Sequence, residues 1–182
     1  DQGNAKTVLD NAVDHPFWPV QLARGTNKYC RTWRYCKGRV IMTDIIEEFE
    51  GFAAQAYPDP LTGGDPWTYG FGSTTKADGT PVKCGDYIEK EPARVLLRDW
   101  LIKYANPIIA TIPYRLTENQ KQALESLIYN IGGPAFKKSK LYTAICKKDY
   151  YNIFKEWDFG VKQLKGLAKR RARELDYFMR DL

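Results

Sequence analysis

The stretch from Glu50 to Ser73 constrains the fold of this chain more than any other part of its sequence. Glu50 lies at the end of a predicted helix, immediately before Gly51. A turn rich in proline and glycine comes next, and an alternating segment typical of a strand begins at Thr68. This order of helix, turn and strand favours a small antiparallel sheet beside helices.

Two carboxylates of this stretch, Glu50 and Asp59, are candidates for acid–base chemistry. Hydrolysis of a glycosidic bond needs one neutral carboxyl group, which protonates the leaving oxygen, and one ionised group, which serves water or the developing sugar cation. Glu50 follows Phe49 and precedes Gly51, and an apolar neighbourhood of this kind can hold a carboxyl group neutral. Asp59 lies between two prolines, which restrict its backbone.

A pair of acids alone is a weak signal, because most acidic side chains are solvated surface charges. Glu47 and Glu48 are better explained as the acidic beginning of a helix. Asp65 also precedes a proline and is an alternative to Asp59, although it fits an ordinary turn residue as well. The spacing from Glu50 favours Asp59 as the second acid, but the sequence does not exclude Asp65.

Further motifs follow in the second half of the chain. They are the run Leu116 to Gln120, the segment Leu127-Ile128-Tyr129-Asn130-Ile131-Gly132, the pair Ala135-Phe136, the residues Trp157 and Gly166-Leu167, and the run Lys169 to Glu174. Taken with Glu50, Asp59 and Thr68, their order and spacing over about residues 43–180 resemble the phage-type lysozymes, glycoside hydrolase family 24.

The resemblance implies an α+β, lysozyme-like fold, with a small antiparallel sheet lobe, a larger helical lobe and a cleft between them. It implies a peptidoglycan hydrolase, an N-acetylmuramidase that cleaves the β-1,4 bond between N-acetylmuramic acid and N-acetylglucosamine. Glu50, Asp59 and Thr68 would then be catalytic, with Glu50 protonating the leaving oxygen and Thr68 holding a water molecule near Asp59. Tyr129 and Asn130 would bind the sugar.

Two departures from the family pattern concern the site. Asp59 and Thr68 are further apart than usual, as if residues 61–65 were a short insertion, and Ser73 stands where many members have histidine. Two alternatives to the muramidase are a lytic transglycosylase and a non-catalytic wall-binding protein on the same fold. The presence of Asp59 and Thr68 argues against the first alternative, and the presence of Glu50 argues against the second.

Positive charge is concentrated near the beginning of the chain. Residues 1–40 hold seven Lys or Arg and three Asp, whereas the rest of the chain is nearly balanced. We therefore predict two parts: residues 1–40, a basic extension, and residues 41–182, the lysozyme-like domain. The segment Arg24–Arg39 is expected to attract an anionic cell envelope, although a solvated arm explains it equally well. A weaker form of the same expectation applies to Lys162–Arg173.

The remaining expectations concern ligands, partners and location. Cys30, Cys36, Cys84 and Cys146 do not have the spacing of a zinc site, and their disulfide pairing stays open. We expect no metal and no cofactor, peptidoglycan as the substrate, no nucleic acid partner and a monomer. No apolar run is long enough for a transmembrane segment. The protein is expected to be made in a host cytoplasm and to act on the cell wall, in the periplasm or outside the cell.

Patterns of apolar residues predict the order of the elements. A first helix is expected over residues 43–53, with Ile46, Phe49 and Ala53 on one face. Residues 55–87 suit a small sheet, and helices follow from Glu91, with Pro107 bending or ending the first of them. A capping box at Thr117 predicts the next helix, and later helices are expected over about 137–147, 149–158 and 166–180.

Overall fold

The computed structural model describes residues 43–60, 62–158 and 165–182. The chain divides into two compact units. The described part of the first is Glu50–Asp99, and the second comprises Thr43–Phe49 and the described residues from Trp100 to Leu182. The predicted basic extension lies outside the described residues. Among the helices of the described part, none has the length and apolar character needed to cross a membrane.

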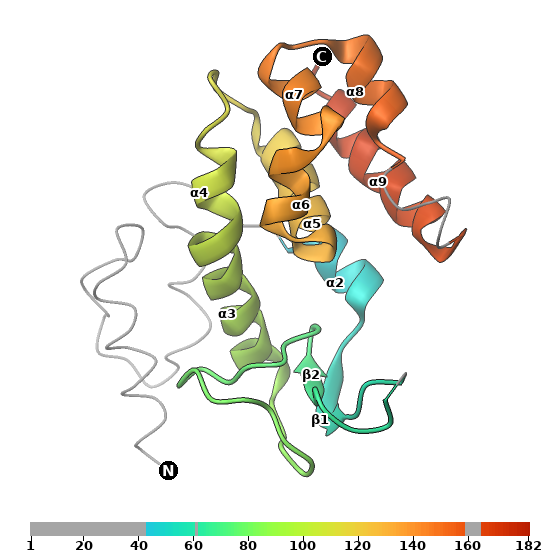
Figure 1. Cartoon of the computed structure of the whole chain (residues 1–182). Helices are drawn as coiled ribbons and strands as arrows, with labels where there is room; N and C mark the ends of the chain where they lie inside the picture. Colours follow the sequence, from blue (N-terminus) through green and yellow to red (C-terminus); the bar gives the residue numbers. More distant parts are fainter. Residues whose placement is uncertain (1–42, 61, 159–164) are drawn as a thin grey trace, which may run out of the picture. The chain divides into compact units, whose positions relative to one another are not determined.

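The first unit contains a hairpin of two antiparallel strands, β1 (Ala53–Tyr57) and β2 (Thr68–Gly70), which Figure 1 shows in cyan and green. Ala53 pairs with Gly70 and Tyr57 with Thr68, so the longer β1 must bend against the shorter β2. Isolated antiparallel bridges add to this pairing, between Gln55 of β1 and Tyr87, Tyr69 of β2 and Ser73, and Thr75 and Pro81. The predicted small antiparallel sheet is confirmed.

Helix α2 (Asp44–Glu50) precedes the hairpin and is shorter than the sequence predicts. Gly51 has a φ of +68°, a left-handed conformation that glycine adopts readily and that ends many helices. The chain then enters β1, so Ala53 belongs to a strand. The prediction of a helix reaching Ala53 was wrong, because the apolar spacing continues past a residue whose backbone ends the helix.

Three helical segments follow one another without an intervening loop: α3 (Lys90–Trp100), the π-helical η1 (Leu101–Ala105) and α4 (Asn106–Ile109). Pro92 lies in the first turn of α3, where its missing N–H group interrupts no helical hydrogen bond. The sequence predicts an irregularity at Pro107, and the structure has π-helical geometry directly before Asn106 and Pro107. Such turns are typical of an interrupted ladder of helical hydrogen bonds.

The second unit is packed around α5 (Glu118–Ile131). The predicted capping box is present, because the Thr117 hydroxyl accepts from the Gln120 N–H at 3.2 Å and the Gln120 side chain accepts from the Thr117 N–H at 3.0 Å. The helices that follow are α6 (Gly133–Lys138), α7 (Lys140–Cys146), α8 (Tyr150–Glu156), the short 3-10 helix η2 (Lys165–Leu167) and α9 (Ala168–Met179). Figure 1 shows α9 beside α5, and the two helices pack together.

The helix expected over residues 137–147 is divided at Ser139 into α6 and α7. The Ser139 hydroxyl donates to the Phe136 carbonyl oxygen at 2.6 Å and accepts from the Tyr142 N–H at 3.0 Å. The Ser139 side chain therefore makes hydrogen bonds with backbone groups at the end of α6 and at the beginning of α7. Large apolar side chains from these helices and from α5 and α9 form the core, including Trp157, Phe136, Phe178, Leu124, Leu127 and Ile145.

Candidate active site

Glu50 is the last residue of α2 and is partly buried. The neighbouring acids of this helix have other partners. The Thr43 hydroxyl donates to a Glu47 carboxylate oxygen at 2.6 Å, and Glu48 lies 3.6 Å from the Arg173 guanidinium. Glu47 thus bonds at the beginning of α2 and Glu48 faces α9, while Glu50 lies at the point where Gly51 redirects the chain.

Asp59 and Thr68 flank the hairpin loop. Thr68 begins β2 and pairs with Tyr57, so Asp59 follows only two residues after that pair. The Asp59 N–H donates to the Gly64 carbonyl oxygen at 3.0 Å, and the Gly63 N–H donates to the Asp59 carbonyl oxygen at 2.8 Å. This closed turn accommodates the extra residues between Asp59 and Thr68, so the hairpin register brings their backbones near each other despite the insertion.

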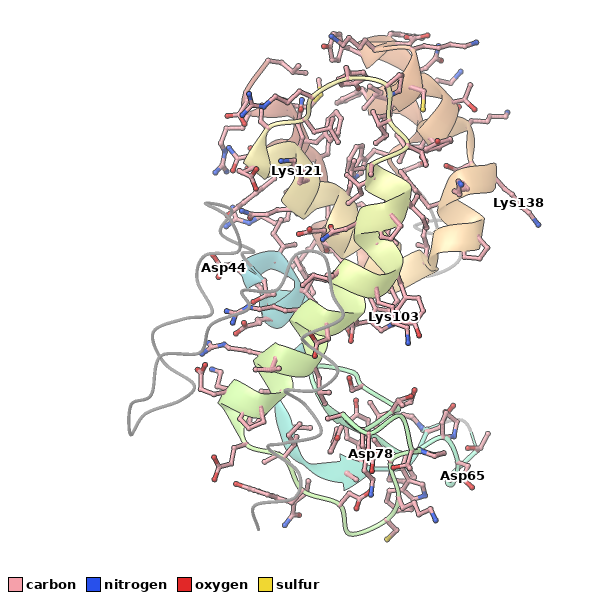
Figure 2. All side chains as sticks on the ribbon, turned by 90° about the vertical axis from the view of Figure 1, so that its left-hand side faces the viewer. Asp44, Asp65, Asp78, Lys103, Lys121 and Lys138 are labelled. Carbon is pink, nitrogen blue, oxygen red and sulfur yellow. The ribbon has the colours of Figure 1, made fainter. Side chains whose placement is uncertain are left out.

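Asp65, the alternative acid, lies in the same loop but is exposed, whereas Asp59 is partly buried. Its backbone carbonyl oxygen accepts a hydrogen bond from the Thr62 hydroxyl at 3.0 Å, as in an ordinary turn. Figure 2 shows the Asp65 side chain at the outer edge of the loop. These environments favour Asp59 as the functional acid, because a fixed carboxylate needs surroundings that hold it in place.

Aromatic side chains lie close in sequence to both Glu50 and Thr68. Phe52, two residues after Glu50, packs its ring 5.4 Å from that of Phe71, which follows β2. Tyr69, next to Thr68, is buried, and its burial together with the carboxylates of Asp86 and Asp78 raises its pKa to about 12. Tyr69 is therefore a neutral side chain that anchors the strand. The chain after Glu50 and the chain after Thr68 thus meet in one apolar contact within the first unit.

The strand that carries Thr68 is also fixed on its other side. Gly70 has a φ of +63°, and a Cβ atom at this position would lie 3.0 Å from the Ala93 Cβ of α3. Asp86 holds the following loop, because its carboxylate accepts from the Lys76 ammonium at 2.9 Å and from the Lys83 N–H at 2.7 Å. These two bonds, the Lys76 bond first, lower the pKa of Asp86 from its ordinary value, so it stays ionised.

The predicted sugar-binding residues lie at the end of α5, in the second unit. Tyr129 is partly buried and makes an edge-to-face contact with Trp100, with ring centroids 4.7 Å apart and an interplanar angle of 79°. Asn130 is exposed, and its side-chain oxygen accepts a hydrogen bond from Arg171 of α9. Neither residue belongs to the apolar core that Leu124, Leu127 and Ile128 form.

The role of α9 was not predicted from the sequence. Lys162–Arg173 was expected to attract the cell wall, but Arg170 and Arg171 are each only 3% exposed. Both donate to the fully buried Glu174, Arg170 at 3.1 Å and Arg171 at 2.6 Å. This part of the prediction was wrong for these two arginines. The spacing of three and four residues before a glutamate on one helix was the signal that could have identified the ion pairs.

No group of three or more His, Cys, Asp or Glu side chains with the geometry of a metal site occurs in the described part of the chain. Cys84 is exposed and Cys146 is partly buried, and both are free thiols. Cys30 and Cys36 lie outside the described residues. Glu50, Asp59 and Thr68 offer carboxyl and hydroxyl groups, which acid-catalysed attack by water on a glycosidic bond requires.

Several known proteins are similar to this chain. The phage lysozyme family matches residues 47–174. The endolysin of Salmonella phage P22 is 35% identical over 137 residues, which cover 74% of this chain and 92% of the relative. The endolysin of Bacillus phage B103 is 31% identical over 140 residues, covering 75% of this chain and 51% of the relative.

Solved structures show the same likeness. A P22 lysozyme mutant has a TM-score of 0.62 at 30% identity, with 75% of this chain and 93% of the other covered. The muramidase domain of SpmX from Asticaccaulis excentricus has a TM-score of 0.62 at 26% identity, with the same two shares covered.

Proposed function

The chain belongs to the phage lysozyme family, and from that premise we propose that Glu50, Asp59 and Thr68 carry out its reaction. The enzyme is a glycoside hydrolase, a muramidase that acts on the peptidoglycan of the bacterial cell wall. The observation that carries the residue assignment is the hairpin register. Gly51 ends α2 at Glu50. The pairing of Tyr57 with Thr68 brings Asp59 near the beginning of β2, where Thr68 supplies the hydroxyl group.

In the proposed mechanism, Glu50 donates a proton to the glycosidic oxygen as the bond to the anomeric carbon breaks. The carboxylate of Asp59 stabilises the developing positive charge on the sugar or removes a proton from the attacking water, and the Thr68 hydroxyl orients that water. Water adds to the anomeric carbon, and the products are a reducing end and a free hydroxyl group. General acid catalysis of this type contributes a factor of about 10²–10⁴ to the rate.

Three matched substitutions test the assignment. Glu50→Gln keeps the shape of the side chain but cannot donate the proton, so turnover of peptidoglycan should fall by at least about 100-fold. Asp59→Asn should be similarly damaging, whereas Asp65→Asn in the same loop should have a mild effect. Half of the wild-type turnover in Glu50→Gln would remove Glu50 from the mechanism. A severe Asp65→Asn with a mild Asp59→Asn would transfer the second role to Asp65.

Product analysis separates hydrolysis from transglycosylation. Hydrolysis leaves reducing muramic acid ends, while a lytic transglycosylase leaves anhydromuramic ends because no water enters. The proposed water-holding role of Thr68 predicts reducing ends, measured by mass spectrometry of digested peptidoglycan. Thr68→Val keeps a β-branched residue in β2 and removes only the hydroxyl, so it should slow hydrolysis without unfolding the hairpin.

We also propose that Tyr129 and Asn130 bind the glycan strand, since the exposed amide and the fixed aromatic ring offer a hydrogen bond and an apolar surface. Action in the periplasm or outside the cell, a monomeric state and attachment to an anionic envelope through residues 1–40 complete the proposal. Deletion of residues 1–40 tests the last point. Activity on whole cells at low salt should fall, while activity on soluble wall fragments should stay unchanged. Increased activity on fragments would indicate instead that residues 1–40 act as a lid over the active site.

A further inference from the structure

A buried cluster of polar and charged side chains joins α5 to α9. Ser126 and Glu174 are fully buried, and Arg170 and Arg171 are each 3% exposed. The Ser126 hydroxyl donates to Glu174 at 2.7 Å, and Arg170 donates to the Ser126 carbonyl oxygen at 3.1 Å. Burying ions in this way is weak evidence for added stability, because desolvation offsets much of the attraction. The cluster therefore invites a functional explanation.

Arg171 connects this cluster to the surface. One end of its guanidinium donates to Glu174 at 2.6 Å, and the other end donates to the side-chain oxygen of Asn130. A guanidinium is planar, so fixing one end also fixes the direction of the other. Burial lowers the pKa of Arg171 and the Glu174 carboxylate opposes this shift, so the guanidinium keeps its charge. A buried charge thus supports one exposed amide.

This contact determines which way the Asn130 amide faces. Arginine has only donors, so the amide must turn its oxygen toward Arg171 and its NH₂ group away from it. Among the residues that the structure describes, this NH₂ group has no hydrogen-bond partner, and Asn130 is exposed. The side chain therefore presents a donor of fixed direction to solvent, and it is suited to a ligand that supplies an acceptor.

We propose that Arg171 is a positioning residue, which holds Asn130 so that its NH₂ group donates to an acetamido carbonyl oxygen of the peptidoglycan strand. This inference rests on the proposed role of Asn130 in substrate binding. Both sugars of the strand carry an acetamido group, and its carbonyl oxygen is a stronger hydrogen-bond acceptor than a sugar hydroxyl. Arg171 acts through Asn130 and needs no contact with the substrate.

Steady-state kinetics on soluble peptidoglycan fragments test the proposal. Asn130→Asp keeps an oxygen for Arg171 but removes the NH₂ donor, and it should raise KM about tenfold with a smaller change in kcat. Arg171→Lys keeps the charge beside Glu174 but loses the planar fork, and it should raise KM to a similar extent. Arg180→Lys, at an exposed ion pair of the same helix, is the matched control and should leave KM unchanged.

Double substitution distinguishes positioning from a separate structural role. In the background of Asn130→Ala, Arg171→Lys should have no further effect on KM, because the residue through which it acts is gone. Additive effects would overturn the proposal. An increased KM in Asn130→Ala together with a normal KM in Arg171→Lys would overturn only the role of Arg171. A normal KM in Asn130→Ala would overturn the proposed binding role of Asn130 itself.

Nuclear magnetic resonance gives a readout that does not depend on activity. In the wild type the Asn130 side-chain amide should show restricted motion on the nanosecond timescale and a chemical shift change on binding of an N-acetylglucosamine oligomer. Arg171→Lys should make this amide mobile. If Arg171→Lys does not fold, Asn130→Asp still decides the question, because an unchanged oligomer affinity in that variant would contradict donation by the NH₂ group.

Discussion

Because of Asp99, the free energy of unfolding should depend on pH in a direction that is unusual for an acidic side chain. Burial raises the pKa of this carboxyl group from 3.8 to about 7. Its carboxylate has no hydrogen-bond or ion-pair partner within residues 43–60, 62–158 and 165–182 that would favour the charged form. The folded protein therefore holds a proton over a pH range in which the unfolded chain has already lost it.

The sign and size of the effect follow from this difference. The folded form binds more protons than the unfolded form between about pH 4 and pH 7, so the free energy of unfolding should fall as the pH rises through this range. Each pKa unit corresponds to about 1.4 kcal/mol, which gives an upper limit of about 4 kcal/mol. Because Asp99 keeps part of its surface in water, we expect about 1–3 kcal/mol.

Asp99→Asn removes the titrating group and nearly keeps its shape. Urea unfolding of wild type and variant, followed by tryptophan fluorescence at pH 5, 6, 7 and 8, should show the variant gaining about 1–3 kcal/mol relative to wild type over this range. Asp158→Asn, at an exposed position, is the control and should track the wild type. A difference between Asp99→Asn and wild type that stays constant with pH would refute the reasoning.

Two further substitutions test how the elements are held. Gly70→Ala combines a left-handed backbone with a Cβ atom 3.0 Å from that of Ala93, so it should destabilise the protein by about 1–3 kcal/mol and reduce activity by displacing the strand of Thr68. Gly64→Ala has open space and should be nearly neutral; equal midpoints of urea unfolding for the two variants would contradict this. Thr117→Ala removes half of the capping box and should lower the free energy of unfolding by about 1 kcal/mol, and an unchanged midpoint would show that the box does not stabilise α5.

The parts of the fold that local chemistry determines could be predicted. The capping box at Thr117 involves residues three apart, so its sequence signature contains nearly all of its physics. The end of the first helix could be located less well, because apolar spacing extended the prediction to Ala53 although Gly51 ends the helix. The π-helical turns at Leu101–Ala105 were not predicted, since no local pattern distinguishes them from a regular helix before Pro107.

The candidate site shows the same division. Glu50, Asp59 and Thr68 lie within one short stretch, and together with the motifs of the second half of the chain this stretch made the resemblance to a family recognisable. Arg170 and Arg171 were interpreted as surface charges, because their partners on α5 are more than 40 residues away in sequence. Both arginines are buried by tertiary packing, in which α9 lies against α5 and Arg170 lies over the Phe49 ring. Charge in a sequence indicates exposure by default, and tertiary contacts decide the exceptions.

The buried cluster between α5 and α9 also limits which substitutions the chain can accept. Loss of Glu174 leaves both arginines charged and buried without it, with a penalty of about 3–5 kcal/mol. Replacing all the members together by apolar residues of similar volume is often neutral or stabilising. The charged cluster and an apolar replacement of it are therefore both stable, but the variants between them are not. Evolution by single substitutions would retain the charged cluster, and with it the hydrogen bond from Arg171 to Asn130.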